Sequence, residues 1–268
     1  MYLVKFKEVS KAVQLVSLSK LRKLGFKLKA RDFTLSIAFE LFKPTLEKLY
    51  RTTMLVFTSE RSNCGKINTE VLSSAKEDIA TNFEMNIPTR IVTVGWKGKK
   101  SLFSKYRIFF TANISEFLCA SFLLSYIVAT SVFETKFEKC VVFFSRYYKI
   151  FRQVATSLIF VSFALFIDFF FFFRTENVFY TLLACYSCLE MYSLYIYNIN
   201  SILLVSFDET MYSELGCRAF SMEMAYKSAL ELISENMLIY NKARQEGITT
   251  DLLEVVSGAI YTVECTDL

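Results

Sequence analysis

The chain has 268 residues, enough for one large domain or two small ones, and its net charge at neutral pH is +5. Hydrophobic residues make up 53% of it and the mean hydropathy is +0.35, a value between those of soluble and integral membrane proteins. The chain contains no histidine, which excludes Ser-His-Asp and Cys-His nucleophiles and the commonest transition-metal ligand. Only two prolines and seven glycines occur, so very long helices are permitted.

The positive charge is concentrated at the N-terminus. Residues 1–31 hold nine Lys and Arg and one acid, a balance of +8, whereas the other 22 basic and 25 acidic residues sum to −3. Apolar residues recur there at helical spacing, which predicts an amphipathic basic helix. Its basic face is either solvated or bound to a membrane surface, a nucleic acid or an acidic partner. The apolar seam comprises Val9, Val13, Val16, Leu21, Leu24 and Leu28.

The middle of the chain has a different pattern. The runs TTMLVFTSE and TRIVTVGWKGKK are short, β-branched and end in polar or glycine-containing turns, with a helical stretch from about Asn68 to Asn82 between them. A second helix from about Ser115 to Phe133 precedes another strand, KCVVFFSRYYKIF. We predict a small α/β domain over residues 54–160. A phosphate cradle in SERSNCGKIN is the alternative to a plain turn, but neither glycine-rich phosphate motif is present.

A phenylalanine-rich segment follows this domain. Residues 154–173 are twenty residues with one charge, Asp168, which is long enough for a transmembrane helix. The alternatives are an apolar elaboration covered by protein and a disordered or refolded strand.

The seven cysteines follow no disulfide-framework spacing and lie mostly among apolar residues, which predicts reduced, buried thiols. Cys185 and Cys188 form the one CxxC pair. A zinc site needs two further ligands, so we predict neither a metal nor a cofactor.

The C-terminal region predicts a long helix with a heptad seam that packs on another helix. The N-terminal seam is the obvious partner, because the two ends of the chain can fold back as an antiparallel pair. The C-terminal seam comprises Met222, Ala225, Ala229, Leu232, Asn236, Ile239 and Ala243.

Three blocks of the sequence resemble one known family. The run YNKARQEGITTDLLEVVSGA, residues 240–259, is similar to the C-terminal signature of gamma subunits of F-type ATP synthases, with Asp251 in place of the usual glutamate. The blocks SELGCRAFSMEMA and TSERSNCGKIN resemble two further motifs of that family. The likeness is strong over residues 186–259, moderate over the α/β region and weak at the N-terminus, where Lys20 falls at a methionine position of the family.

The resemblance implies an α/β fold with long helices. In it, the N- and C-terminal helices form an antiparallel coiled coil beside a central Rossmann-like α/β domain. A membrane span would pull apart two elements that pack on one domain, so we favour a protein-covered elaboration and keep a span at 154–173 as the alternative. The implied parts are the N-terminal helix 1–50, the α/β foot domain 54–185 with its Phe-rich elaboration 161–185, the C-terminal helix 186–259 and an extension at 260–268.

The resemblance also implies a function. It makes the chain a non-catalytic rotor shaft that couples proton-driven rotation of a c ring to ATP synthesis in a ring of alpha and beta subunits. The implied partners are the alpha and beta subunits, the c ring and the small central-stalk subunits (delta and epsilon). It implies no nucleic acid and a peripheral position at the membrane. The implied contacts to beta subunits are Arg244, Gln245 and Thr249, with Glu214 and Arg218 lower on the same helix. Lys20 marks either a local slip of the helix register or an altered contact with the ring.

Residue usage bears on the location of the complex. The Phe, Tyr and Lys bias is typical of an AT-rich genome, which favours the matrix side of the mitochondrial inner membrane. The alternative is the cytoplasmic face of a bacterial plasma membrane.

Overall fold

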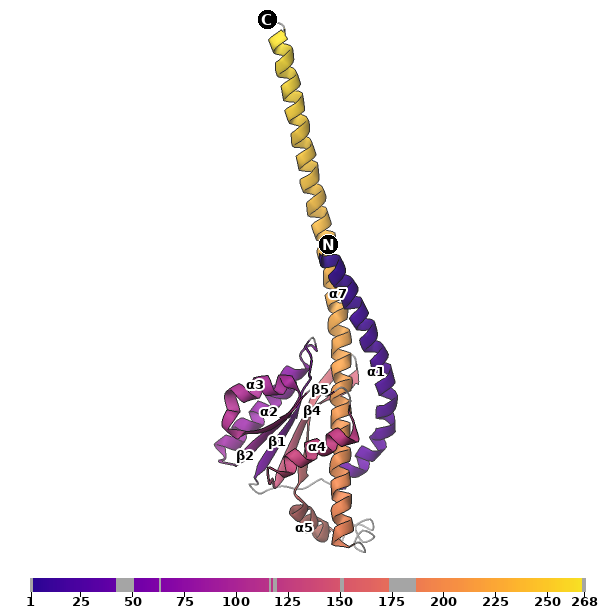
Figure 1. Cartoon of the computed structure of the whole chain (residues 1–268), viewed down its shortest axis with the longest axis vertical. Helices are drawn as coiled ribbons and strands as arrows, with labels where there is room; N and C mark the ends of the chain where they lie inside the picture. Colours follow the sequence, from indigo (N-terminus) through magenta and orange to yellow (C-terminus); the bar gives the residue numbers. More distant parts are fainter. Residues whose placement is uncertain are drawn as a thin grey trace. The chain divides into compact units, whose positions relative to one another are not determined.

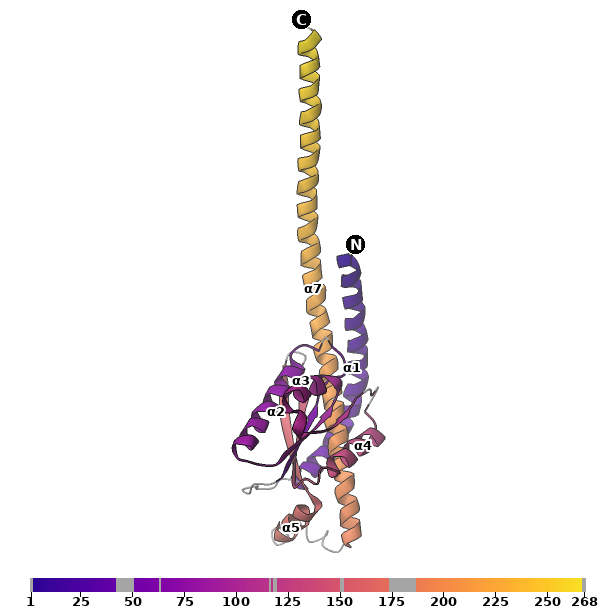
Figure 2. The same ribbon diagram turned by 60° about the vertical axis from the view of Figure 1, so that its left-hand side comes forward.

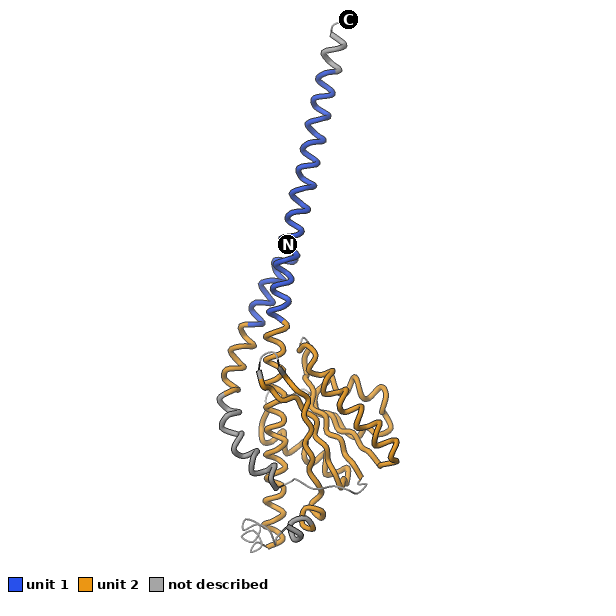
Figure 3. Tube along the Cα trace, turned by 180° about the vertical axis from the view of Figure 1, so that it is seen from behind, with its two compact units in different colours: residues 1–14, 222–268 blue, residues 15–221 orange. Residues whose placement is uncertain are grey.

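The computed structural model forms two compact units, coloured separately in Figure 3. One unit comprises residues 1–14 and 222–268, and the other comprises residues 15–221. The residues described are 2–41, 51–62, 64–115, 117, 120–149, 152–173 and 187–266.

The larger unit is built around a five-stranded mixed sheet with the strand order β3-β2-β1-β4-β5. Strand β1 pairs in parallel with β2 and β4, β2 pairs in parallel with β3, and β4 and β5 form an antiparallel pair. The strands are β1 (Thr52–Phe57), β2 (Thr89–Val94), β3 (Phe110–Ile114), β4 (Lys139–Lys149) and β5 (Arg152–Val161).

Both faces of the sheet are covered by helices. Successive side chains of a strand point to opposite faces, so one strand contributes to two core clusters. Met54 and Val56 of β1 join a core cluster with α2 (Ile67–Glu84) and α3 (Trp96–Tyr106). Leu55 and Phe57 join a second cluster with α4 (Phe122–Phe133) and the first part of α7 (Cys188–Thr266). Figures 1 and 2 show α2 and α3 on one side of the sheet and α4 and α7 on the other. This burial on two sides explains why β1 is buried throughout.

Polar contacts fix α7 on the antiparallel strands. The Tyr195 hydroxyl donates to the carbonyl of Val161 at 2.7 Å, and the Ser213 hydroxyl donates to the carbonyl of Ser145 at 3.0 Å. Both hydroxyl groups are buried, and a buried polar group is destabilising unless it is hydrogen-bonded. These two hydrogen bonds therefore define the position of α7 along β4 and β5.

A capping box starts α7. The backbone N–H and the hydroxyl of Ser187 donate to Glu190 Oε2 at 2.7 and 2.9 Å, and the Glu190 N–H donates back to Ser187 Oγ at 3.4 Å. The hydrogen bonds from the Ser187 backbone and hydroxyl lower the pKa of Glu190.

The two terminal helices run antiparallel, as predicted. In the smaller unit, Lys11 Nζ of α1 (Tyr2–Leu41) lies 5.5 Å from the centre of the Tyr226 ring, and Gln14 Nε2 donates to Glu223 Oε2 at 3.4 Å. From the first contact to the second, the residue number rises along α1 and falls along α7, so the two helices are antiparallel. The predicted fold class, long terminal helices with a central α/β domain, is confirmed.

The register of α1 differs from the predicted one. Val9 and Val16 are exposed, whereas Ser10 and Ser17 are buried. The buried line therefore carries small hydroxyl side chains, which bring two helix axes closer together than valines would. Hydrophobicity alone favoured Val9 and Val16 and misplaced these two positions by one residue, whereas Val13, Leu21 and Leu24 of the predicted seam are half-buried.

The C-terminal seam is covered over part of its length only. Met222 and Ala225 are half-buried and Ala229 is buried, but every residue from Ser234 to Ile260 is exposed. The predicted helix–helix packing is therefore wrong for the outer seam positions Leu232, Asn236, Ile239 and Ala243.

Several elements of the sheet domain differ from the prediction. The run TRIVTVGWKGKK divides into β2 and the start of α3, whose buried positions Gly98, Leu102 and Tyr106 recur every four residues among lysines. The short 3₁₀ helix η1 (Arg107–Phe109) leads into β3, which ends at Ile114. The helix predicted to begin near Ser115 is α4, which begins only at Phe122. The run KCVVFFSRYYKIF, predicted as a single strand, contains β4, which pairs with β5 in an antiparallel hairpin.

The twenty mostly apolar residues that suggested a membrane span do not form one continuous helix. Residues 154–173 are divided between β5, which ends at Val161, and α5 (Phe163–Phe173). Among the described residues, we find no helix with both the length and the apolar character of a bilayer crossing. Phe163 and Phe166 pack against Tyr195, with ring centres 5.3 and 5.4 Å apart. The side chains of residues 169–186 lie outside the described set.

We expect the turn after β2 to tolerate no side chain. Gly95 has φ of 101°, and a Cβ placed there would lie 2.3 Å from the carbonyl oxygen of Thr58. Gly95→Ala should lower the free energy of unfolding by at least about 2 kcal/mol, measured by urea denaturation. The matched control is Gly247→Ala, where a Cβ meets nothing within 4 Å and helix propensity rises. Equal stability of the two variants would contradict the geometry of this turn.

Candidate functional site

The outer part of α7 is a helix without cover. From Ser234 to Ile260 all side chains are exposed, although many are large and apolar. Soluble proteins rarely leave so much apolar surface open, so this surface is a candidate binding region. Its most prominent apolar residues are Met237, Leu238, Ile239, Tyr240, Ile248, Leu252, Leu253, Val255, Val256 and Ile260.

Three of the predicted contact residues lie on this bare helix. Arg244, Gln245 and Thr249 are all exposed. The Thr249 hydroxyl donates to the backbone carbonyl of Gln245 at 2.8 Å, so these two residues share one face of the helix. Arg244 forms no ion pair within the described part of the chain, and its guanidinium is available to an external carboxylate.

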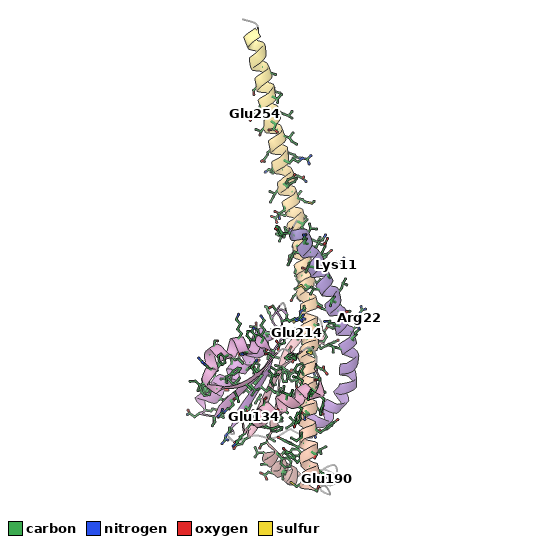
Figure 4. The ribbon with its side chains drawn as sticks, in the orientation of Figure 1. Lys11, Arg22, Glu134, Glu190, Glu214 and Glu254 are labelled. Carbon is green, nitrogen blue, oxygen red and sulfur yellow. The ribbon has the colours of Figure 1, made fainter. Side chains whose placement is uncertain are left out.

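The other two predicted contact residues, Glu214 and Arg218, lie on α7 within the larger unit and pair with each other. The Arg218 guanidinium forms an ion pair with Glu214, and the two side chains are only 15% and 13% exposed. Figure 4 labels Glu214 beside the sheet domain. The structure therefore does not bring these two residues together with Arg244 and its neighbours on a bare surface.

The ion pair is part of a connection between α7 and the loop after β1. Arg218 Nη2 donates to the sulfur of Cys64 at 3.2 Å, and Cys64 Sγ donates to the carbonyl of Arg61 at 3.3 Å. The loop is further tied by Asn68, whose Oδ1 accepts from the Ser59 N–H at 2.9 Å. The two sequence blocks that resemble the family thus meet in space.

Sequence reasoning found both blocks but missed their contact. Gly65 has φ of 58°, and a Cβ there would lie 3.3 Å from Ser221 Oγ and 3.8 Å from Cys217 Sγ. A glycine followed by a helix start indicates a tight turn, but only the fold places that turn against α7.

Cys64 is a protected thiol. Burial, with the carboxylate of Glu214 as a second cause, raises its pKa to about 11, against the opposite effect of Arg218. Because the thiolate is the reactive form, Cys64 is inert at neutral pH. By contrast, Cys188 is exposed, which corrects the prediction that its thiol is buried. Cys185 lies outside the described residues. No group of three or more potential metal ligands occurs within the ranges that the structure describes.

A cavity of about 520 Å³ lies between α4 and the first part of α7. Its walls are mostly aromatic and aliphatic, and they include the acidic side chain of Glu134, which Figure 4 labels. Asn200 Oδ1 is buried there without a hydrogen-bond partner in the described part of the chain. The cavity is lined by Tyr126, Ala129, Thr130, Phe133, Glu134, Tyr192, Ile196 and Asn200. The sequence signal missed here was the pair of asparagines in YIYNIN, polar residues on an otherwise buried stretch.

The remaining predicted residue, Lys20, lies on α1 and its side chain is exposed.

An antiparallel pair of long helices with a bare outer segment, together with a mixed α/β domain, defines a helical stalk protein. Solved structures share this fold. A chain of the Euglena gracilis mitochondrial ATP synthase (OSCP, F1 and c-ring, rotational state 3) has a TM-score of 0.86 at 17% identity, covering 99% of this chain and 93% of its own. A chain of the Tetrahymena thermophila mitochondrial ATP synthase central stalk and c-ring has a TM-score of 0.65 at 19% identity, and the match covers 81% of this chain and 99% of that one.

Sequence comparison identifies the family. The family model described as ATP synthase matches residues 3–260. The ATP synthase gamma chain of Rickettsia typhi is 26% identical over 274 residues, which cover 94% of this chain and 93% of its own. That of Trichlorobacter lovleyi is 27% identical over 285 residues, covering 94% and 92%. The chain therefore belongs to the ATP synthase family, as a gamma subunit.

We expect the thiols to differ sharply in reactivity. At pH 8 a thiol with a pKa of about 11 is roughly 0.1% thiolate. Iodoacetamide should therefore modify Cys188 well before Cys64, as followed by peptide mass spectrometry. The Cys64 rate should keep rising about tenfold per pH unit up to pH 10, because its thiolate forms only as pH approaches the raised pKa. A Cys64 rate that reaches its plateau near pH 9 would contradict the protected state.

Proposed function

We propose that this chain is the central rotor shaft of an F-type ATP synthase, which couples proton-driven rotation of a c ring to ATP synthesis in a ring of alpha and beta subunits. The observation that carries this proposal is the bare segment of α7 from Ser234 to Ile260. At 1.5 Å per residue it is about 40 Å long, comparable to a protein domain. A helix of this length with exposed apolar side chains on all sides needs a surrounding partner, and a ring supplies one.

In this mechanism the shaft acts by position. A rotating asymmetric helix pair presents a different face to each catalytic subunit in turn, and the subunit shifts between open and closed states according to the face it meets. The shaft itself does no bond chemistry in this proposal. The absence of histidine from the chain supports this, since it removes the usual activated nucleophiles and general bases.

Arg244, Gln245 and Thr249 are the proposed contacts to beta-subunit loops. Arg244 is exposed and has no ion pair within the described residues, so it is free to meet carboxylates on the ring. A guanidinium exchanges bidentate carboxylate partners as its surroundings change, which suits a contact that is made and broken at every step.

Glu214 and Arg218 support a different role from the one implied by the family resemblance. Their mutual ion pair and low exposure favour holding the loop of Cys64 on α7 over exchanging partners with a beta subunit. Removal of either side chain would leave the other charge unpaired in a largely desolvated site. Lys20 is exposed on α1 and remains the proposed site of an altered contact with the ring.

The α/β domain is the proposed foot, which meets the c ring and the small central-stalk subunits. The open cavity between α4 and α7 supports this, because exposed apolar side chains lie on the two helices that form it and Asn200 Oδ1 within it lacks a partner among the described residues. The exposed apolar neighbours are Phe122, Leu123, Tyr126, Ile127, Leu189, Tyr192 and Tyr197. The partners proposed here are proteins and not nucleic acids.

The proposed location is the matrix side of the mitochondrial inner membrane, with the chain peripheral to the bilayer. The fold likeness to mitochondrial ATP synthase chains supports it, whereas the relatives by sequence are bacterial and support the cytoplasmic face of a plasma membrane. Fractionation of the source cells with antibody detection of this chain distinguishes the two locations.

We expect Arg244→Ala combined with Gln245→Ala to leave the complex assembled but to slow coupled ATP synthesis and hydrolysis. A hydrogen bond to a charged group contributes about 1.5–3 kcal/mol, and a loss of this size at the rate-limiting rotation corresponds to roughly ten- to a hundredfold slower turnover. The measurement is steady-state hydrolysis and proton-driven synthesis by purified complex.

The control for this experiment is Ser73→Ala combined with Lys76→Ala on α2, which also removes one cation and one polar group. It should assemble and turn over normally. An Arg244 and Gln245 double variant that assembles and keeps the wild-type rate would show that these two residues do not carry torque.

A further inference from the structure

One exposed face of α3 alternates aromatic and cationic side chains. Trp96, Lys100, Phe103 and Arg107 follow one another at steps of four, three and four, which places them on a single stripe of the helix that ends as η1 begins. All four are exposed, with Trp96 49% and Phe103 38% accessible. Neither ring is buried by the fold.

The stripe has a fixed direction. The other face of α3 is pinned to the sheet by Gly98, Leu102 and Tyr106, and the Gly98 N–H donates to Thr58 Oγ1 at 2.8 Å. A Cβ at Gly98 would lie 2.9 Å from the same hydroxyl oxygen, so the helix lies as close to β1 as its backbone permits. The aromatic and cationic stripe therefore points away from the sheet.

The charge of this segment has one sign. Residues 96–109 contain Lys97, Lys99, Lys100, Lys105 and Arg107 and no acidic residue. The cations stay close to the rings. Lys99 Nζ lies 5.4 Å from the centre of the Trp96 ring, and the Arg107 guanidinium carbon lies 5.6 Å from the centre of the Phe103 ring.

Apolar surface continues beyond the helix. Ile108 in η1 is 90% exposed, and Phe109 beside it is exposed as well. A lysine face that only keeps a protein soluble has no need of a half-exposed tryptophan and an almost fully exposed isoleucine among its charges.

We propose that this α3 face, formed by Trp96, Lys100, Phe103, Arg107 and Ile108, binds an anionic phospholipid surface. Cations near such a surface are attracted to its headgroups, while tryptophan and aliphatic side chains enter the boundary between headgroups and acyl chains. The exposed apolar residues favour a lipid surface over an acidic protein. This binding surface goes beyond the rotor function proposed above, and it places a second, lipid contact on the α/β domain.

Such binding is peripheral and reversible. Its attraction depends on charge, so it weakens as added salt shortens the screening length from about 10 Å at 0.1 M to about 3 Å at 1 M. The apolar side chains add a component that salt does not remove.

The single tryptophan of the chain makes the test direct, because Trp96 lies in the proposed face. We expect the emission of the full-length chain to shift to shorter wavelength on addition of phosphatidylglycerol-containing vesicles and to stay unchanged with phosphatidylcholine vesicles. Lipids that carry a doxyl quencher near the headgroup should quench this emission, and salt should reverse most of the shift.

Two variants locate the binding. Lys100→Gln with Arg107→Gln should weaken vesicle binding about thirty-fold, which corresponds to about 1 kcal/mol for each lost cation. Ile108→Ser changes a side chain that is 90% exposed; it should weaken the part of the binding that persists in high salt. Thermal unfolding followed by circular dichroism checks that both variants are folded.

The matched control is Arg22→Gln with Lys23→Gln, which removes two exposed cations from the more basic helix α1. It should bind vesicles as the wild type does. Equal loss of binding in this control would assign the interaction to α1 and overturn the proposal. An absent wavelength shift with anionic vesicles would also overturn it, as would a shift produced by an acidic peptide such as polyglutamate and not by vesicles.

Discussion

Tyr195, Ile199 and Leu203 belong to the same helix that continues as a bare rod, yet they lie in the hydrophobic core on one face of the sheet. This burial is the constraint on which the other parts depend. Without it, one face of the sheet would be exposed and the capping box at Ser187 would hold only a free helix end. The domain and the rod therefore share one continuous set of helical hydrogen bonds, and a force on the domain reaches the outer helix without passing through a loop.

The polar contact of Cys64, Arg218 and Glu214 adds a second attachment on the same helix. It lies beside the carboxyl end of β1, where the chain turns away from the sheet at Gly65. An apolar contact would hold this loop equally well against unfolding but would allow it to slide. The hydrogen bond from Arg218 Nη2 to Cys64 Sγ fixes its position along α7, because a hydrogen bond is favourable only over a narrow range of distance and angle. The ion pair with Glu214 on the same helix holds the guanidinium in place.

Much of the fold could be predicted from the sequence because its strongest patterns are long. The heptad steps from Met222 to Ala229 and the β-branched runs around Met54 predicted the helix pair and the inner strands. Helix α3 was missed because Gly98 lowers the apparent helical propensity and follows directly on the β-branched run of β2, although the buried positions of α3 recur at a helical interval. The register of α1 was missed because burial there selects small side chains such as Ser10, which hydrophobicity does not favour.

The candidate site was predictable to a lesser degree. Exposure of Arg244 follows from its position on a polar stretch of helix. The pairing of Glu214 with Arg218 follows from their spacing of four residues, but the presence of Cys64 beside them depends on contacts between residues more than a hundred positions apart. The cavity at Asn200 requires both α4 and α7 in place.

Two of the seven glycines, Gly247 and Gly258, lie in the bare part of α7, where a Cβ would meet nothing within 4 Å. No packing within the described part of the chain requires a glycine at either position, and each lowers helix propensity by about 1 kcal/mol relative to alanine. Their mechanical effect is compliance: the outer helix bends more easily at these two points than elsewhere along its length. Elastic deformation under load is therefore concentrated in the outer helix, while the sheet and its buried helices stay rigid.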